Sequence, residues 1–211
     1  MFRHAQSKHS SSLENAICTH KNPERARKAI QLLQLICPSN KYFQSDILSH
    51  SDPLNAYEAL NYLINAKLDI PSFWPMVHNH PTKPADASRA LIGLNSAKLL
   101  SIELAKTVVA SESPTLLADA IKQLHLVGLL NNNHIALLSE HPRPRELSLV
   151  ITHLEKAGIH TKANRDALML HPHLYLAMDA IAKLSYHGLL NDETRAALGF
   201  YKKPQDLIDT L

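Results

Sequence analysis

Prolines recur along this chain at an almost constant interval. They occupy positions Pro23, Pro53, Pro84, Pro114, Pro144 and Pro204. The intervals are 30 or 31 residues, apart from a final interval of 60, in which Leu174 takes the place of the skipped proline. A period of about 20–50 residues is the signature of repeat proteins, so this spacing constrains the fold more strongly than any single residue does.

Three series of apolar residues share this period. The first series is Ile30, Leu60, Leu91, Ile121, Ile151 and Ile181. The second series is Leu33, Leu63, Leu94, Leu124, Leu154 and Leu184. The third series is Ile17, Ile47, Val77, Val108, Leu138, Leu168 and Leu198. Each series contains the same single step of 31 residues, which places one extra residue in the loop at Pro81–Pro84, where insertions are tolerated. Because all three series contain the same extra residue at the same place, chance does not explain the repeat.

Each repeat unit predicts a short helix followed by a longer one. In the unit from Asn164 to Leu190, the short helix follows Thr161, a good N-cap residue, and stops before Pro172. The longer helix carries apolar residues at spacings of three and four, and it ends at Gly188. The same signals recur in other units, as Gly128 and Gly158 at the helix end and as Asn131 and Asn191 at the cap.

A helix pair of this size cannot bury its own apolar stripe, and stacking on neighbouring units solves that problem. We therefore predict an all-α solenoid of about seven helix-turn-helix repeats, each about 30 residues long. One repeat domain is expected over residues 13–211, after a flexible tail over residues 1–12. The last unit stops at Leu211, part-way through its long helix, so this helix is either a short cap or the start of further chain.

The composition fits a folded protein of ordinary charge. Of the 211 residues, 45% are hydrophobic and 19% are charged, and the net charge is only +3. The repeat positions that would read bases in a nucleic-acid-binding array show no recurring code, since they hold Gln31, Asn61, Ile92, Lys122, Thr152 and Ala182. No run of about 18 apolar residues occurs. We therefore expect neither a nucleic-acid partner nor a membrane span.

Histidine is unusually frequent, with 14 residues. One repeat position holds His20, His50, His80, His141 and His171, with Ser111 and Tyr201 in the two other units. Zinc needs nitrogen ligands at about 2.0–2.1 Å, whereas equivalent residues of stacked helices lie about 8–10 Å apart, so consecutive histidines cannot share one ion. We expect each histidine to end its short helix, as a cation whose ring bonds to free carbonyls. No metal and no cofactor are therefore predicted.

No residue pattern indicates an active site. Cys18 and Cys37 lack a surrounding catalytic motif, and free cysteines are most often small buried hydrophobes. Cys37 also stands at the position that Gly128 holds in its own unit. The carboxylates are scattered, and neither HExxH nor GxSxG occurs. We therefore expect a protein without catalytic activity.

A solenoid presents a long surface to other molecules, usually through one helix of each pair. Residues outside the apolar series are the candidates for partner contacts, and aromatic residues are enriched at interface hot spots. These candidates are Tyr57, Tyr62, Ile64, Trp74, His125, His153 and Tyr186. A packing role is the alternative for the tyrosines and for the pair Phe73–Trp74, which lies in a short helix that Pro75 is expected to interrupt.

The pattern Gly-Leu-Leu-Asn, then Asn-x-x-Ala-Leu, then His-Pro-x-Pro resembles helical repeats in secreted effectors of Legionella and related intracellular bacteria. The matching stretches run from Gly128 to Arg145, from Gly158 to His173 and from Gly188 to Leu198. The first units match loosely, with Cys37-Pro38 and Lys98-Leu99 where Gly-Leu is expected. The resemblance implies a helical scaffold, export by a type IV secretion system into the host cytosol and a role in virulence. It supplies no catalytic residues.

We therefore expect an interaction scaffold that binds a host protein or a fellow effector through its long-helix surface. Two alternatives stay open. The chain is a targeting or regulatory repeat arm of a longer, enzyme-bearing effector, or it is a metal-binding enzyme that uses the histidine positions. Outside the effector setting, two unpaired cysteines fit a cytoplasmic protein.

Overall fold

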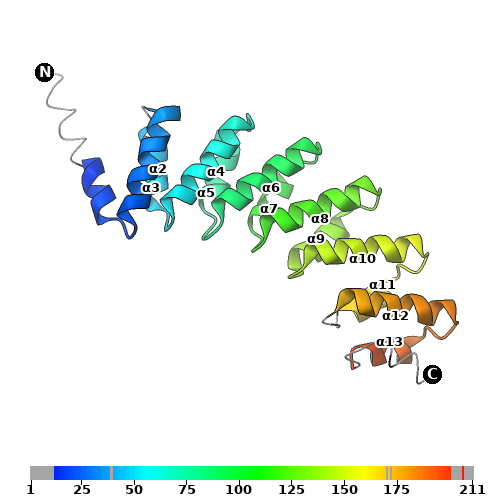
Figure 1. The fold of residues 1–211 in the computed structure, drawn as a ribbon. Helices are drawn as coiled ribbons and strands as arrows, with labels where there is room; N and C mark the ends of the chain where they lie inside the picture. Colours follow the sequence, from blue (N-terminus) through cyan, green and yellow to red (C-terminus); the bar gives the residue numbers. More distant parts are fainter. Residues whose placement is uncertain (1–11, 39, 170, 172, 201–205, 207–211) are drawn as a thin grey trace, which may run out of the picture. The chain divides into compact units, whose positions relative to one another are not determined.

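The computed structural model describes residues 12–38, 40–169, 171, 173–200 and 206. Over these residues the regular secondary structure is helical, without a strand, as predicted (Figure 1). The longer helices are α2 (Pro23–Ile36), α4 (Pro53–Asn65), α6 (Pro84–Ser96), α8 (Pro114–Leu126), α10 (Pro144–Lys156) and α12 (Leu174–Tyr186). The shorter helices are α3 (Lys41–Ser49), α5 (Ile70–His78), α7 (Ile102–Val109), α9 (Asn132–Glu140), α11 (Lys162–Met169) and α13 (Asp192–Leu198).

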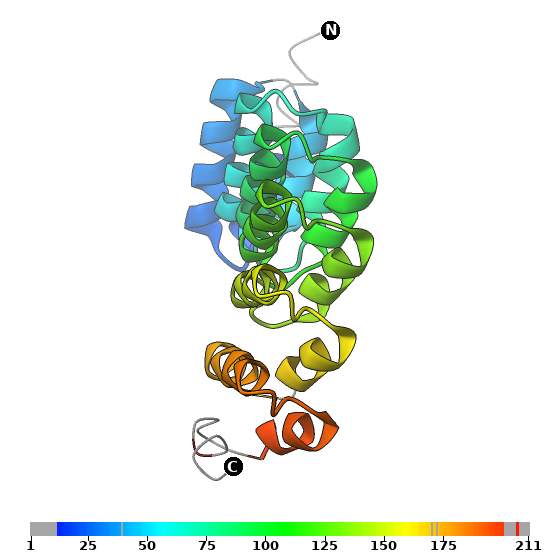
Figure 2. The same ribbon diagram turned by 90° about the vertical axis from the view of Figure 1, so that its right-hand side faces the viewer.

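The chain forms two compact units, unit 1 (Met1–Ala118) and unit 2 (Asp119–Leu211). In unit 1, α2 packs on α4 and α4 packs on α6, while the shorter α5 packs on α7 (Figure 2). In unit 2, α10 packs on α12, and α11 packs on α13. Neighbouring helices thus pack in sequence order within each unit, which is consistent with an α-helical repeat. Of the predicted tail, residues 1–11 lie outside the described part of the chain, whereas Ser12 is helical.

The three periodic apolar series form the core, as predicted. No member of any series is more than 3% exposed. Full burial of a leucine or isoleucine side chain contributes about 1.5–3 kcal/mol, so the three periodic series stabilise every repeat. The longer helices α2, α4, α6 and α10 begin with a proline, whose fixed φ suits the first helical turn.

The ends of the longer helices also follow the prediction. Gly128, Gly158 and Gly188 have φ values of 74°, 68° and 69°, in the left-handed region that favours glycine. The turn after α8 is a Schellman motif, in which the Leu129 N–H donates to the Leu124 carbonyl at 2.9 Å and the Gly128 N–H donates to the His125 carbonyl at 3.0 Å. The same hydrogen-bond pattern closes α4, α6, α10 and α12.

Cys37, which was expected to match these glycines, does not. Its φ is −142°, so α2 ends in a different backbone conformation from the later long helices. Lys67 and Lys98 hold the glycine position in the next two repeats, with positive φ values of 54° and 58°. The helix-end conformation therefore persists where a lysine must adopt it, although a side chain makes the left-handed region less favourable.

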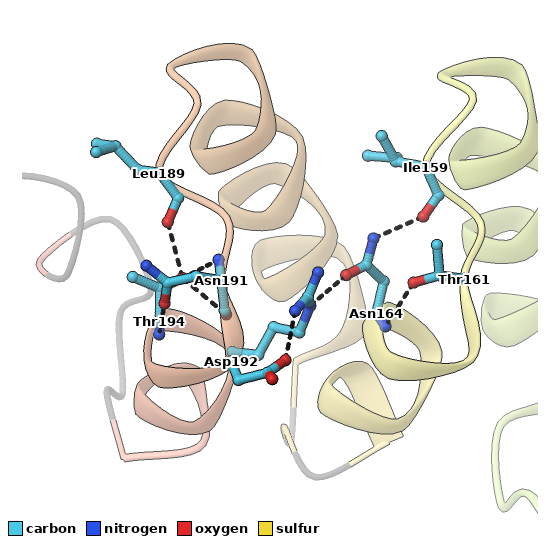
Figure 3. Close-up of polar contacts among 8 residues, drawn as sticks. Ile159, Thr161, Asn164, Leu189, Asn191, Asp192 and Thr194 are labelled. Atoms are coloured by element: carbon cyan, nitrogen blue, oxygen red, sulfur yellow. Dashed lines mark hydrogen bonds and ion pairs between the residues drawn. The ribbon is translucent and has the colours of Figure 1, made fainter.

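The predicted caps of the shorter helices are present. The side chains of Asn131, Thr161 and Asn191 accept hydrogen bonds from backbone N–H groups three residues later, which satisfies donors at the start of α9, α11 and α13. Figure 3 shows two of these caps, at Thr161 and Asn191. The expectation that Pro75 interrupts its helix is wrong, because α5 runs without a break from Ile70 to His78. Pro75 lies inside α5 and lacks the N–H that would donate to the Pro71 carbonyl, and the helix continues past it to His78.

Candidate functional site

A pocket of about 520 Å³ lies in unit 1, where the end of α2 and the start of α3 meet α4 and α5. Its size falls within the range of about 300–1,000 Å³ that is typical of ligand sites. Nearly all of its lining surface is apolar. We call it the apolar pocket, and its lining residues are Cys37, Tyr42, Phe43, Ile64, Ile70, Pro71, Trp74 and Pro75.

Trp74 is held firmly in one wall of the apolar pocket. Its side chain is only 1% exposed, and its ring meets the Phe43 ring edge to face, with 5.9 Å between the centroids. The indole Nε1–H donates a hydrogen bond of 2.7 Å to the Asp46 carboxylate on α3. The polar edge of the indole is therefore already bonded, and the ring has only apolar surface to offer a ligand.

His78 strengthens the link between α5 and α3. Its Nε2 lies 2.9 Å from the Asp46 carbonyl oxygen and 3.2 Å from the Ser49 hydroxyl. Its ring also lies 5.3 Å from the Trp74 ring, measured between centroids. Trp74 thus bonds to the side chain of Asp46, and His78 bonds to its backbone carbonyl. These polar contacts connect α5 to α3, and both helices line the pocket.

Two predicted contact residues, Ile64 and Trp74, come together in the apolar pocket. Tyr57 does not, because it is buried in the core of unit 1, and this burial raises the pKa of its phenol, as does the nearby Glu58 carboxylate to a smaller extent. Tyr62 is half-buried, and the Arg89 guanidinium lies 5.4 Å from its ring centroid in a cation–π contact. Tyr57 therefore has the packing role that was the alternative to a partner contact. Trp74 forms part of the pocket wall and is not an exposed contact residue.

The remaining predicted residues, His125, His153 and Tyr186, are exposed on the longer helices of unit 2. Tyr186 is 87% exposed, and its ring contacts the neighbouring His187 edge to face. These three side chains stay available for partner contacts, but the structure does not gather them into a described pocket.

Most of the pocket lining was not predicted from the sequence, because partner contacts were expected mainly on the longer helices. Tyr42, Phe43, Ile70 and Pro71 all lie on the shorter helices α3 and α5. One signal was present in the sequence: Phe43 lies 30 residues before Phe73, at the same repeat position. An aromatic residue that recurs outside the core series marks a position that differs from the later repeats.

The recurrent histidines form hydrogen bonds that were predicted only in part. In unit 1, the Nε2–H groups of His20, His50 and His80 donate to the backbone carbonyls of His50, His80 and Ser111, over 3.1, 3.1 and 3.3 Å. Each acceptor residue holds the equivalent position of the following repeat. We call these three histidines the histidine chain.

The other ring nitrogen of each histidine is an acceptor. The Nδ1 atoms of His20, His50 and His80 accept hydrogen bonds of 2.9, 3.0 and 2.9 Å from the backbone N–H groups of Asn22, Asp52 and Lys83. The His50 Nδ1 atom also lies 3.1 Å from the Asp52 carbonyl oxygen. The expected carbonyl contacts are thus present, but they reach the next repeat.

Histidines at the same position in unit 2 keep the second of these contacts. The Nδ1 atoms of His141 and His171 accept from the N–H groups of Arg143 and His173, over 3.0 and 2.9 Å. Burial lowers the pKa of His141 below its ordinary value. Within the described residues, no three His, Cys, Asp or Glu side chains converge as a metal site would require.

Unit 2 has a polar network at the repeat position that Phe43 and Phe73 occupy in unit 1. His134, Asn164 and Thr194 hold that position, and their side chains donate to the carbonyls of Leu129, Ile159 and Leu189. The Asn164 Oδ1 atom also accepts from Arg195 Nε of the next repeat at 2.7 Å (Figure 3). Arg195 Nη1 in turn pairs with Asp192 at 2.7 Å. These side chains bond mainly to one another and to backbone.

No protein-family model matches the chain, and no curated protein is found to be related to it in sequence. Over the described residues, the helices are too short or too polar to cross a membrane.

Proposed function

We propose that this protein is a non-catalytic scaffold that binds another protein by taking one bulky apolar side chain of its partner into the apolar pocket of unit 1. The supporting observation is the pocket lining. Eight residues line a pocket of about 520 Å³, and the surface that they present to it is almost entirely apolar. The nearby polar groups of Trp74, Asp46 and His78 bond to one another, so they do not call for a polar ligand.

The pocket has the features of an interface hot spot. Hot spots are enriched in tryptophan and tyrosine and lie in well-packed pockets that exclude water. Tyr42 stands at the rim with 60% of its surface exposed, whereas Trp74 is held in the wall by Phe43 and Asp46. A rigid wall reduces the entropy lost on binding, since little of it has to be ordered when the partner arrives.

The wider setting is also part of this proposal. We propose that the repeats continue as one solenoid, and that the chain is a bacterial effector delivered into host cells, acting there alone or as the repeat arm of a longer effector. The repeat pattern from Gly128 to Leu198 supports this setting through its resemblance to effector repeats. A translocation reporter fused to the chain tests it: the reporter should enter host cells only from bacteria with a working type IV secretion system.

Peptide display tests the binding site itself. Peptides selected on the intact protein should carry a leucine, phenylalanine or tryptophan anchor, and their binding should change the fluorescence of Trp74, the only tryptophan in the chain. Tyr42→Ala and Ile64→Ala should weaken these peptides at least tenfold. Tyr186→Ala, on an exposed side chain of unit 2, is the matched control and should leave their affinity unchanged.

The display experiment has a clear contrary result. If the selected peptides bind Tyr42→Ala and Ile64→Ala as tightly as the wild type but lose affinity for Tyr186→Ala, the partner surface lies on the longer helices of unit 2. That outcome would replace the pocket with the exposed set His125, His153 and Tyr186.

A further inference from the structure

The start of α11 contains two buried polar atoms whose hydrogen-bonding capacity is unused. Within the described ranges, His160 Nε2 and Arg165 Nε are the buried side-chain atoms that have no hydrogen-bond partner. Such atoms are rare in native folds and call for an explanation. The His160 side chain is only 7% exposed, and its Nδ1 atom contacts the Glu155 carboxylate. Arg165 is half-buried, so of the two it is the residue that a ligand can reach.

The next repeat shows how an arginine at this position is normally satisfied. Arg195 follows Arg165 by 30 residues and begins its helix in the same way. Its Nε–H donates to the Asn164 side chain at 2.7 Å, and its Nη1 pairs with the Asp192 carboxylate at 2.7 Å (Figure 3). A guanidinium is always charged and can only donate, so these two acceptors satisfy two sides of it.

Arg165 lacks both acceptors because the sequence differs at the two positions that supply them. Lys162 stands where Asp192 stands in the later repeat, and a lysine side chain offers no acceptor. His134 stands where Asn164 stands, and its ring forms no hydrogen bond with Arg165 Nε. In the described part of the chain only the Nε atom of Arg165 is both buried and unbonded, so its Nη1 and Nη2 groups reach the surface.

We propose that Arg165 binds the carboxylate of an acidic side chain on a partner protein, in the place that Asp192 takes beside Arg195. The contact is an ion pair with charge-assisted hydrogen bonds from the Nη groups, and no covalent bond changes. Lys162, which is exposed in the same helical turn, adds a second positive charge. The site lies in unit 2, so this inference does not rest on the apolar pocket of unit 1.

The nearby charges favour a carboxylate over a phosphate. Asp166 follows Arg165 directly, and Glu155 lies against the His160 ring just before the helix. A phosphate monoester carries about two negative charges at neutral pH, which these two carboxylates would repel. A carboxylate carries one negative charge, and the later repeat accommodates a carboxylate at the equivalent place.

A substitution within the full chain tests the geometry without a partner. Lys162→Asp places a carboxylate three residues before Arg165, just as Asp192 lies three residues before Arg195. The new carboxylate should pair with Arg165 and raise the ratio of folded to unfolded protein about two- to fivefold in urea unfolding. Arg165→Gln in the same chain should remove the part of this gain that comes from the pair.

Lys41→Asp is the matched control for this measurement. It makes the same charge change at the first residue of α3, where Gln44 stands in place of the arginine. Any gain in this control comes from the helix start alone and should not depend on Arg165. A gain in Lys162→Asp that survives Arg165→Gln unchanged would overturn the ion pair.

Binding is measured on the full chain with hexaglutamate, and hexaglutamine serves as the uncharged control peptide. NMR titration at constant ionic strength follows the Nε–H signals of the arginines. The Arg165 signal should shift with hexaglutamate and stay in place with hexaglutamine. Arg165→Gln and Lys162→Asp should each weaken hexaglutamate about fivefold or more. Arg145→Gln, which removes one charge at an exposed position of α10, should change the affinity less than about twofold.

The outcomes separate this site from the proposed function. Equal weakening by Arg165→Gln and Arg145→Gln would show that the peptide responds to net charge alone, and the site would be wrong. Inorganic phosphate that shifts the Arg165 signal more strongly than hexaglutamate does would overturn the carboxylate as the ligand. Tyr42→Ala, in the apolar pocket, should leave hexaglutamate binding unchanged. Display peptides that ignore Tyr42 would therefore refute the pocket alone, and hexaglutamate that ignores Arg165 would refute this site alone.

Discussion

Unit 1 and unit 2 use one repeat position in opposite ways. Near the start of the shorter helices, unit 1 has the apolar residues Phe43, Phe73 and Leu104, and unit 2 has the polar residues His134, Asn164 and Thr194. The frame around this position is constant, since the same apolar series and the same helix caps recur in both units. Such a frame tolerates both apolar and polar side chains at this one position.

The two choices have different consequences for binding. In unit 2, the polar side chains bond to carbonyls of the preceding turn, and Asn164 also bonds to Arg195 of the next repeat, so these groups satisfy one another. In unit 1, aromatic rings leave a pocket that no side chain of the described residues fills. Asn164 at this position thus links two repeats, whereas Phe43 at the equivalent position lines the apolar pocket.

The largest expected effect is the loss of the rigid pocket wall. Trp74→Ala removes a fully buried ring and leaves the Asp46 carboxylate without its indole donor, so unit 1 should lose about 3–5 kcal/mol of unfolding free energy. Urea unfolding followed by circular dichroism measures this loss. Tyr175→Ala, on an exposed side chain of α12, should change stability by less than about 0.5 kcal/mol. Equal losses in the two variants would contradict the buried role of Trp74.

The polar network of unit 2 should respond to a single amide. Asn164→Leu removes the partner of the Ile159 carbonyl and of Arg195 Nε, so we expect a loss of about 1–3 kcal/mol. Asn133→Leu, at an exposed position of α9, serves as the control in the same unfolding assay. A stable Asn164→Leu protein would show that this position accepts apolar residues in unit 2 as readily as in unit 1.

The stability of unit 2 should depend on pH through His141. Burial lowers its pKa, so the stabilising effect of the neutral ring is complete above the unfolded value of about 6.5 and is lost as the pH falls through the lower folded value. Unfolding measured from pH 7.5 to 5 should therefore show a smaller pH dependence in His141→Gln than in the wild type. His153→Gln, at an exposed site, should follow the wild-type curve.

The helix ends should give the smallest changes, with opposite signs. Gly158→Ala forces a side chain into a left-handed conformation and should cost about 1 kcal/mol, although open space surrounds the new methyl group. Lys98→Gly relieves the same conformation in unit 1 and should gain up to about 1 kcal/mol. Thermal unfolding of both variants checks the pair, and a change of the same sign in both would show that the two turns are not equivalent.

The sequence was informative where a contact repeats. The core series, the caps and the positive φ values of Gly128, Gly158 and Gly188 all follow from local chemistry repeated with one period. The role of the histidines was less accessible, because the acceptor of each Nε2–H lies 30 or 31 residues away, in the next repeat. Side-chain spacing along one helix does not reveal such a bond.

The pocket was only partly predictable for a related reason. Ile64 and Trp74 were singled out because they lie outside the core series, but the pocket exists only where α3 and α5 meet. Cys37 lines it at the end of α2 and Tyr42 near the start of α3, and the φ of Cys37 is negative, unlike that of the residues at the same position in the later repeats. An irregular turn at one repeat is not visible in a pattern that assumes equal repeats.

Photo-crosslinking from two positions tests the central claim most directly. A photoreactive phenylalanine is placed at Tyr42, on the rim of the apolar pocket, or at Tyr186, on the exposed surface of unit 2. We expect the probe at Tyr42 to mark one apolar segment of the partner, and we expect Ile64→Ala to abolish that crosslink. Crosslinks from Tyr186 alone, or a Tyr42 crosslink that survives Ile64→Ala, would contradict binding through the apolar pocket.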